Sequence, residues 1–179
     1  GVDEVLNTIE TFLAELSLTA PRVARLATVL CVNVLDSRDN VARSWREAVE
    51  WHRGEVLSGE ADVLRAAFDG PVRAIRCACQ VLERSVLVGG GVRIALHAGQ
   101  LVCERDGWSG PALTVAEQIL DSARPNEIVV SGAVKDLVVG SGIQFADWQA
   151  TASSYGRPAV FAVLPESAAV LTKSASRRS

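Results

Sequence analysis

The feature that most constrains this sequence is a run of apolar and β-branched residues at positions 23–35. The apolar residues occupy both odd and even positions, so the alternation expected of a strand with one solvent-facing side is missing. β-Branched residues such as valine and threonine favour strands. The run therefore predicts a strand buried at the centre of a sheet, with helices packed on at least one side.

Helix-like and strand-like segments alternate after this strand. Helical spacing of apolar residues predicts helices at 39–53, 71–88, 111–123 and 133–138. Short apolar runs predict strands at 61–68, 92–98, 100–104, 127–131, near Phe145 and near Val160, with a hairpin turn at 105–107. The order βαβαββαβαββ predicts an α+β sandwich of ferredoxin-like character, a mixed and mainly antiparallel sheet flanked by helices.

The composition excludes several classes of protein. Of the 179 residues, 49% are hydrophobic and 22% are charged, and the formal net charge is −3. These values exclude wholesale disorder and leave no excess of positive charge for a nucleic-acid partner. No apolar stretch approaches the ~20 residues that span a bilayer. We therefore expect a globular domain with no nucleic-acid partner and no membrane span in this segment.

Cysteine usage indicates a reducing compartment. The chain has four cysteines, Cys31, Cys77, Cys79 and Cys103. Their spacing matches neither a disulfide framework nor a zinc site. We interpret them as small buried residues, which predicts a cytoplasmic location. His97 lies in a strand pattern and is expected to be a hydrogen-bonded core histidine, and no Gly-x-Ser-x-Gly motif indicates a hydrolase.

The two ends of the chain differ from its middle. Residues 3–16 have apolar side chains at helical spacing and predict an amphipathic helix, too short to be stable without packing on the domain or on a partner. We predict an N-terminal helix and linker at 1–21, a domain at 22–165 and a flexible tail at 166–179. The start of the sequence does not resemble a signal peptide, and we expect a further N-terminal domain in a longer chain.

Several separate motifs together resemble class III nucleotidyl cyclases. The similar segments, in the family's order, are residues 25–37, 66–78, 92–99, 124–131 and 134–137. The first resembles the opening strand of the cyclase domain and the third its central strand. The resemblance covers roughly residues 23–164, and it implies the cyclase sandwich fold. The N-terminal helix resembles, more weakly, the segment that precedes the cyclase domain in fusions with an α/β-hydrolase.

The resemblance implies a specific chemistry. In the family, the ribose 3′-hydroxyl of ATP or GTP attacks the α-phosphate and pyrophosphate leaves. Two carboxylates hold two Mg²⁺ or Mn²⁺ ions, because hard cations prefer anionic oxygen ligands. The catalytic parts come from two chains, so the resemblance also implies a homodimer, or a heterodimer with another cyclase domain.

The two metal positions fall on Asn33 and Asp62. An amide is nearly isosteric with a carboxylate but neutral, and it is a poorer ligand for a divalent ion. A polar residue at a strand end is an equally good interpretation of Asn33, and Asp36 would substitute only with rearrangement. The family brackets the second position with glycines, whereas Ala61 and Val63 stand here and crowd the backbone's approach to phosphates.

The positions that bind the purine and the phosphates are also changed. The base-reading lysine position falls on Ser58, and its acidic partner falls on Gly107, with Asp106 adjacent. The phosphate-binding lysine position falls on Ala152. None of these side chains supplies the contacts that the family makes.

The transition-state positions fall on the predicted helix that begins near Pro111. The family places an asparagine and, four residues later, an arginine on one face of this helix. Thr114 and Gln118 stand there instead. A glutamine does not neutralise charge on a phosphoryl group, and an arginine in such a role is worth ~10³–10⁵ in rate. Among the family's chemical positions, only Asp62 keeps its residue type.

These observations favour a degenerate class III cyclase homology domain, a pseudocyclase that acts as a regulatory or dimerisation module of a larger signalling protein. The alternative is a weak or heterodimer-dependent cyclase that converts ATP or GTP to the cyclic 3′,5′-nucleotide. A third hypothesis is a nucleotide-binding sensor without turnover. We expect no resident cofactor, and Mg²⁺ or Mn²⁺ with ATP or GTP enters only if residual activity exists.

Overall fold

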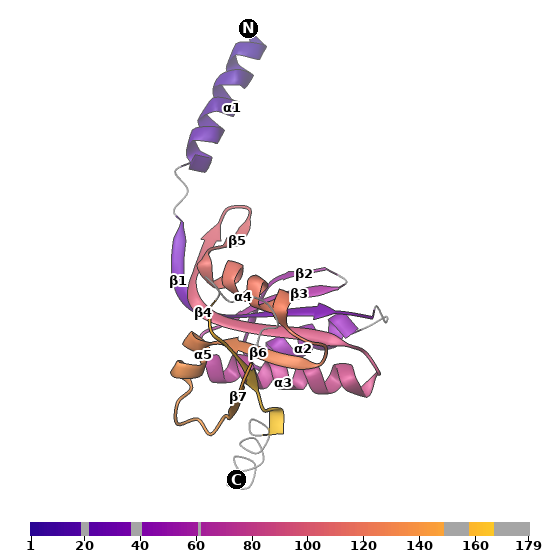
Figure 1. Ribbon diagram of the computed structural model, residues 1–179. Helices are drawn as coiled ribbons and strands as arrows, with labels where there is room; N and C mark the ends of the chain where they lie inside the picture. The colour runs from indigo at the N-terminus through magenta and orange to yellow at the C-terminus, as the bar shows by residue number, and fades with distance from the viewer. Residues whose placement is uncertain (19–21, 37–40, 61, 149–157, 167–179) are drawn as a thin grey trace, which may run out of the picture.

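The computed structural model describes residues 1–18, 22–36, 41–60, 62–148 and 158–166 (Figure 1). In chain order the elements are α1 (Val2–Leu18), β1 (Val23–Val34), α2 (Val41–Trp51), β2 (Glu55–Gly59), β3 (Val63–Phe68), α3 (Pro71–Leu87), β4 (Val92–Glu104), β5 (Gly107–Ser109), α4 (Pro111–Ser122), β6 (Glu127–Ser131), α5 (Gly132–Leu137), β7 (Phe145–Asp147) and β8 (Val160–Val163). Most of the expected helices and strands are present. The tail expected at 166–179 lies almost wholly outside the described residues.

The strands form one sheet with the order β2-β3-β1-β4-β6-β8-β7, and β5 pairs with β4. The β4–β6 pair is parallel, and the other pairs are antiparallel. This confirms the prediction of a mixed, mainly antiparallel sheet flanked by helices. β1 lies between β3 and β4, and residues 27–32 are buried, as the two-sided apolar pattern predicted.

Two hydrophobic cores cover the two faces of the sheet. Leu30 and Val32 of β1 belong to the larger core, which α2, α3 and α5 complete. Val29 and Cys31, which alternate with them, belong to the second core beneath α4. Side chains of a strand point alternately to opposite faces. The sheet therefore has an α3 face and an α4 face, and Figure 1 shows these helices on its two sides.

The packing of α2 on α3 anchors the α3 face. Trp45 of α2 is fully buried, and its indole Nε1 donates a hydrogen bond to Ser85 Oγ of α3 at 3.1 Å. Ser85 Oγ in turn donates to the carbonyl of Val81 at 2.8 Å. Because a buried indole N–H without a partner is costly, this bond lets a large side chain fill the core without a polar penalty.

Two strand predictions were wrong. The structure contains β2, a short edge strand that was not predicted because its two apolar residues, Val56 and Leu57, are adjacent and only partly buried. The predicted strands at 92–98 and 100–104 form a single strand, β4, that continues through Gly99. A Cβ on Gly99 would lie 3.3 Å from His97 Nε2 and 3.7 Å from Ala112. Gly99 therefore marks the close approach of α4 and not the end of a strand.

α1 forms as predicted, but its apolar side chains are exposed. Val5 is 60% exposed and Phe12 is 61% exposed. Figure 1 shows α1 extending away from the sheet. Across the described residues, every helix is too short or too polar to cross a membrane. The prediction that α1 packs on the domain or on a partner remains a prediction.

Candidate functional site

Asn33 lies near the end of β1 on the α4 face of the sheet. Its neighbours Val32 and Val34 pack into the core on the α3 face, so alternation directs Asn33 to the other side. The strand register pairs Asn33 with Val63 of β3 and with Arg93 of β4. Paired residues on antiparallel strands have Cβ atoms about 5 Å apart. Asn33 and Arg93 are therefore neighbours on adjacent strands.

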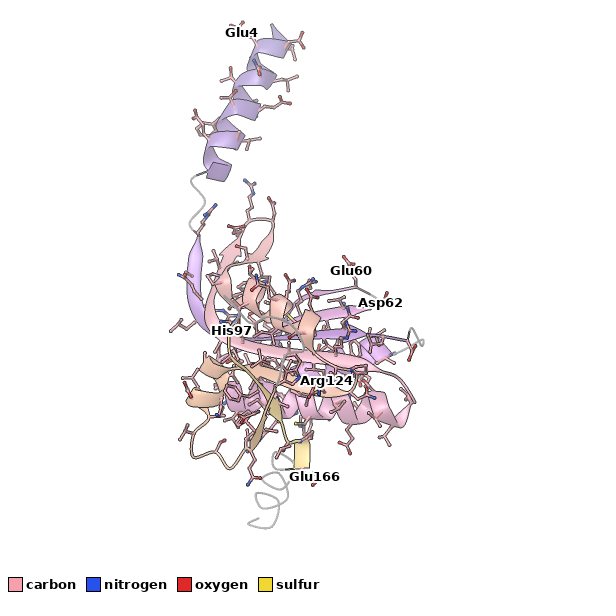
Figure 2. All side chains as sticks on the ribbon, in the orientation of Figure 1. Glu4, Glu60, Asp62, His97, Arg124 and Glu166 are labelled. Carbon is pink, nitrogen blue, oxygen red and sulfur yellow. The ribbon has the colours of Figure 1, made fainter. Side chains whose placement is uncertain are left out.

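Asp62 lies in the tight turn that joins β2 to β3. The Glu60 amide donates to the carbonyl of Val63 at 3.0 Å, and the Val34 amide donates to the carbonyl of Asp62 at 2.8 Å. The side chain of Asp62 is exposed, and Figure 2 shows it with Glu60 at the same end of the hairpin. The structure thus brings the two sequence-predicted metal positions to adjacent strands. Ala61 lies outside the described residues.

The residues at this edge of the sheet do not fit a pair of divalent cations. Within the described ranges, no group of three or more histidine, cysteine, aspartate and glutamate side chains could hold a metal ion. The carboxylates at this end of the sheet, Asp36, Glu60 and Asp62, are exposed and do not converge into such a group, and Asn33 contributes a neutral amide. Two divalent cations need anionic oxygens that converge on them.

A polar network that the sequence analysis missed crosses the α4 face. Arg65 of β3 forms an ion pair with Glu117 of α4, with Nε 2.5 Å from Oε1. Its Nη1 donates to Ser58 Oγ of β2 at 3.3 Å. Ser58, which stands at the expected position of the base-reading lysine, is therefore hydrogen-bonded to an arginine of the same chain. The signal in the sequence was Arg65 itself, a charge inside the apolar strand of residues 63–68.

Cys31 is buried between the strands of this network. It pairs in register with Arg65 on β3 and with Ala95 on β4. Burial raises the pKa of its thiol to about 12; the Glu117 carboxylate adds to the rise and the Arg65 guanidinium opposes it. The thiol therefore stays protonated at neutral pH, which lowers its reactivity as a nucleophile.

The two transition-state positions lie on the outer surface of α4. Thr114 and Gln118 are both exposed, whereas Ala116 and Leu120 are buried against the sheet. The hydroxyl of Thr114 donates to the carbonyl of Gly110 at 3.3 Å. These side chains share one face, as the spacing predicted, and that face points away from the sheet that carries Asn33.

The remaining sequence-predicted positions lie far from Asn33 or outside the described residues. Asp106 and Gly107 are exposed in the β4–β5 turn, where Gly107 has φ +142° and pairs with Glu104. Asn33 pairs near the first residue of β4, and the turn follows the last, so the 13 residues of β4 separate them by about 40 Å of strand. Ala152 lies outside the described residues.

His97 is hydrogen-bonded, as predicted, but it is half-buried and not part of the core. Its Nδ1 lies 2.7 Å from Ser131 Oγ, and burial lowers the pKa of the imidazole. Ser131 also caps α5, accepting a hydrogen bond from the Val134 amide at 3.4 Å. His97 therefore connects β4 to the start of α5.

The structure has the fold of the catalytic domains of class III adenylyl and guanylyl cyclases. The adenylyl cyclase CyaB of Pseudomonas aeruginosa superposes with a TM-score of 0.69 at 13% identity, over 81% of this chain and 96% of that one. The guanylate cyclase domain of RhGC from Catenaria anguillulae, solved with GTP, gives 0.65 at 13% identity, over 80% and 98%. An adenylate/guanylate cyclase/hydrolase of Silicibacter pomeroyi gives 0.62 at 19% identity, over 81% and 99%. These likenesses confirm the expected fold.

Proteins that are similar to this chain in sequence do not indicate an activity. Uncharacterized proteins of Mycobacterium tuberculosis and Mycobacterium bovis are 33% identical to this chain over 96 residues, which are 52% of this chain. The matched region is 33% of their length, so the chain spans about a third of these curated relatives. No protein-family model matches the sequence.

Proposed function

We propose that this domain is a catalytically degenerate cyclase homology domain that acts as a regulatory or dimerisation module of a larger signalling protein. The observation that carries the proposal is the combination of a cyclase fold with a neutral Asn33 beside Arg93 at a metal position. The described residues keep the cyclase fold, whereas among the described positions of the chemistry only Asp62 keeps its charge.

The missing charges bear on two different parts of the reaction. Asp62 alone supplies anionic oxygen at the metal positions, and a single exposed carboxylate binds divalent cations weakly. On α4, Gln118 stands where a guanidinium would meet the charge on the phosphoryl group, a contribution of ~10³–10⁵ in rate. Both losses act in the same direction, although catalytic effects are not additive.

The geometry supports a dimer. Thr114 and Gln118 point away from the sheet that carries Asn33, and the β4–β5 turn lies at the opposite end of β4. Only a second chain in the opposite orientation brings these parts beside Asn33 and Asp62. Half-buried apolar side chains, Trp108 and Leu113 among them, border the exposed face of α4 and suit such a contact.

Two further observations support a place in a larger protein. This chain matches about a third of its mycobacterial relatives. The similar structures include a guanylyl cyclase domain of a fusion protein from Blastocladiella emersonii and the Silicibacter cyclase/hydrolase. Such a domain would not turn over a substrate. By forming a dimer with a second copy or with an intact cyclase domain, it would transmit a signal from another domain of the same protein.

The test is a cyclase assay of the purified protein with ATP and with GTP, each with Mg²⁺ and with Mn²⁺. We expect no cyclic nucleotide above the Asp62→Ala variant, and a dimer by sedimentation. Turnover that disappears in Asp62→Ala would overturn the proposal. Activity that arises only on mixing with an intact cyclase domain would assign this chain to a catalytic heterodimer, which also contradicts a purely regulatory role.

A further inference from the structure

A groove opens on the α3 face of the sheet between the start of α3 and the end of α5. Its volume is about 310 Å³, and residues of β1 and β4 line it together with the ends of these two helices. Thr28 of β1 lies between Ala27 and Val29, which belong to the core beneath α4, so alternation directs Thr28 to the α3 face. Asn33 lies on the α4 face, and the groove is therefore separate from the candidate cyclase site.

Most of the lining of the groove is apolar. Pro71 begins α3 and Leu137 ends α5, and Leu26 and Ala98 come from the two strands. Leu26 and Leu137 are large exposed apolar side chains, whose removal from water favours binding. Cavities of about 300–1,000 Å³ with such linings are typical of sites for small molecules. The groove therefore suits a compact apolar molecule.

Thr28 places a polar group in this apolar lining. The residue is 3% exposed, yet in the described part of the chain its hydroxyl has no hydrogen-bond partner. A buried hydroxyl without a partner is costly, and a hydroxyl can donate one hydrogen bond and accept two. Because Thr28 lines the groove, its hydroxyl is available to a molecule that binds there. The lining therefore favours a ligand with one hydrogen-bonding group on an apolar body.

The charges near the groove oppose one another and favour an uncharged ligand. Among the described residues of the lining only Asp69 is charged, and its Oδ1 lies 3.6 Å from Arg25 Nη1. Asp69 also lies two residues before α3, whose first N–H groups carry partial positive charge, and Arg73 is exposed in the first turn. At the other wall, Lys135 and Asp136 of α5 have opposite charges. An anion would therefore meet Asp69, and a cation would meet Arg25 and Arg73.

We propose that this groove binds a small, uncharged and mainly apolar molecule that hydrogen-bonds to Thr28. The apolar body lies between Leu26 and Leu137, and a hydroxyl or carbonyl group of the ligand pairs with the Thr28 hydroxyl. The site goes beyond the proposed function, because it lies on the opposite face of the sheet from Asn33 and requires no turnover. A bound molecule contacts β1, α3 and α5 together, which suits a ligand-responsive regulatory module.

The experiment is a titration of the whole chain with three probes, followed by ¹H–¹⁵N NMR spectra near neutral pH. The probes 1-adamantanol, 1-adamantanamine and adamantane-1-carboxylate share one compact hydrocarbon body and carry a hydroxyl, an ammonium and a carboxylate. We expect 1-adamantanol to shift the amide signals of Leu26, Ala98 and Leu137. It should bind at least about fivefold more tightly than either ion, because an ion loses hydration in the groove without gaining a charged partner.

Three variants test the contacts. Thr28→Val keeps the shape of the side chain and removes the hydroxyl, so the affinity for 1-adamantanol should fall about fivefold. Leu137→Ser removes one apolar wall and should lower this affinity at least as much. Leu87→Ser is the matched control, because Leu87 is an exposed leucine at the other end of α3, and it should leave the affinity unchanged. If circular dichroism shows that Thr28→Val does not fold, the Leu137→Ser titration decides.

The inference is overturned if 1-adamantanol shifts no groove signals, if either ion binds as tightly, or if Thr28→Val or Leu137→Ser binds as tightly as wild type. Two further results would assign the groove to another occupant and overturn it as well. Nuclear Overhauser contacts between Leu137 and α1 in the free protein would assign it to α1, and groove signals that shift with protein concentration would assign it to a second copy. Cyclase turnover would instead contradict the proposed function and leave this site in place.

Discussion

Arg65 of β3 and Glu117 of α4 form an ion pair on the α4 face of the sheet, and the same guanidinium donates to Ser58. The pair joins a strand to the helix that carries Thr114 and Gln118. Side-chain exposures of 30% for Arg65 and 42% for Glu117 place the pair between the core and the surface. It therefore helps to hold α4 at a defined position on the sheet.

A double-mutant cycle with Arg65→Gln and Glu117→Gln measures this coupling. We expect about 1 kcal/mol in urea unfolding, the upper end for pairs that solvent partly screens. The matched control is Arg43 and Glu47, an i,i+4 pair with exposures of 80% and 59%, for which ~0.3 kcal/mol is expected. Equal coupling energies in the two cycles would contradict a structural role for Arg65.

Three cysteines should resist alkylation in the folded protein. Burial raises the thiol pKa to about 12 for Cys31 and Cys77 and to about 11 for Cys79, from 9.0. For Cys31 at pH 8 this lowers the thiolate fraction roughly a thousandfold. Iodoacetamide labelling followed by mass spectrometry should leave these three residues unmodified, whereas all react in guanidinium. Rapid labelling of Cys31 without denaturant would contradict the packing of β1.

Acidification should destabilise the protein partly through His97. Burial lowers the pKa of His97 below 6.5, so between its folded and unfolded pKa values the unfolded chain binds more protons. The free energy of unfolding therefore falls as the pH falls below about 6.5. Urea unfolding near neutral pH and near pH 5.5 should show a larger loss in wild type than in His97→Gln. His52, whose pKa is also lowered, is present in both proteins, so an equal loss would show that His97 does not contribute.

Much of the fold could be predicted because its signals are local. The apolar residues on both faces of β1 and the apolar stripe along α3 predict which side chains are buried. Both elements form near the expected positions. β2 was missed because a five-residue edge strand with only two adjacent apolar residues has no such pattern. Gly99 was misinterpreted because its role depends on Ala112, a residue of a helix that follows in the chain.

The candidate site could be predicted only as a set of residue types. The resemblance to the family placed Asn33 and Asp62 at the expected metal positions, and the structure brings them to adjacent strands. The sequence did not indicate that Glu117 belongs to this site, because an isolated acidic residue on a helix usually faces solvent. The partnership of Glu117 with Arg65 depends on how α4 is rotated on the sheet, which packing determines.

By itself, the sequence determined which stretches become helix or strand and which chemical groups are present, because the period of apolar residues and the identity of a side chain are local properties. The tertiary structure alone decided that Arg93 stands beside Asn33 and that Gln118 points away from them. Strand register and helix rotation arise from contacts between residues distant in the chain, as the 60 residues from Asn33 to Arg93 illustrate. Such contacts form only when the whole core packs.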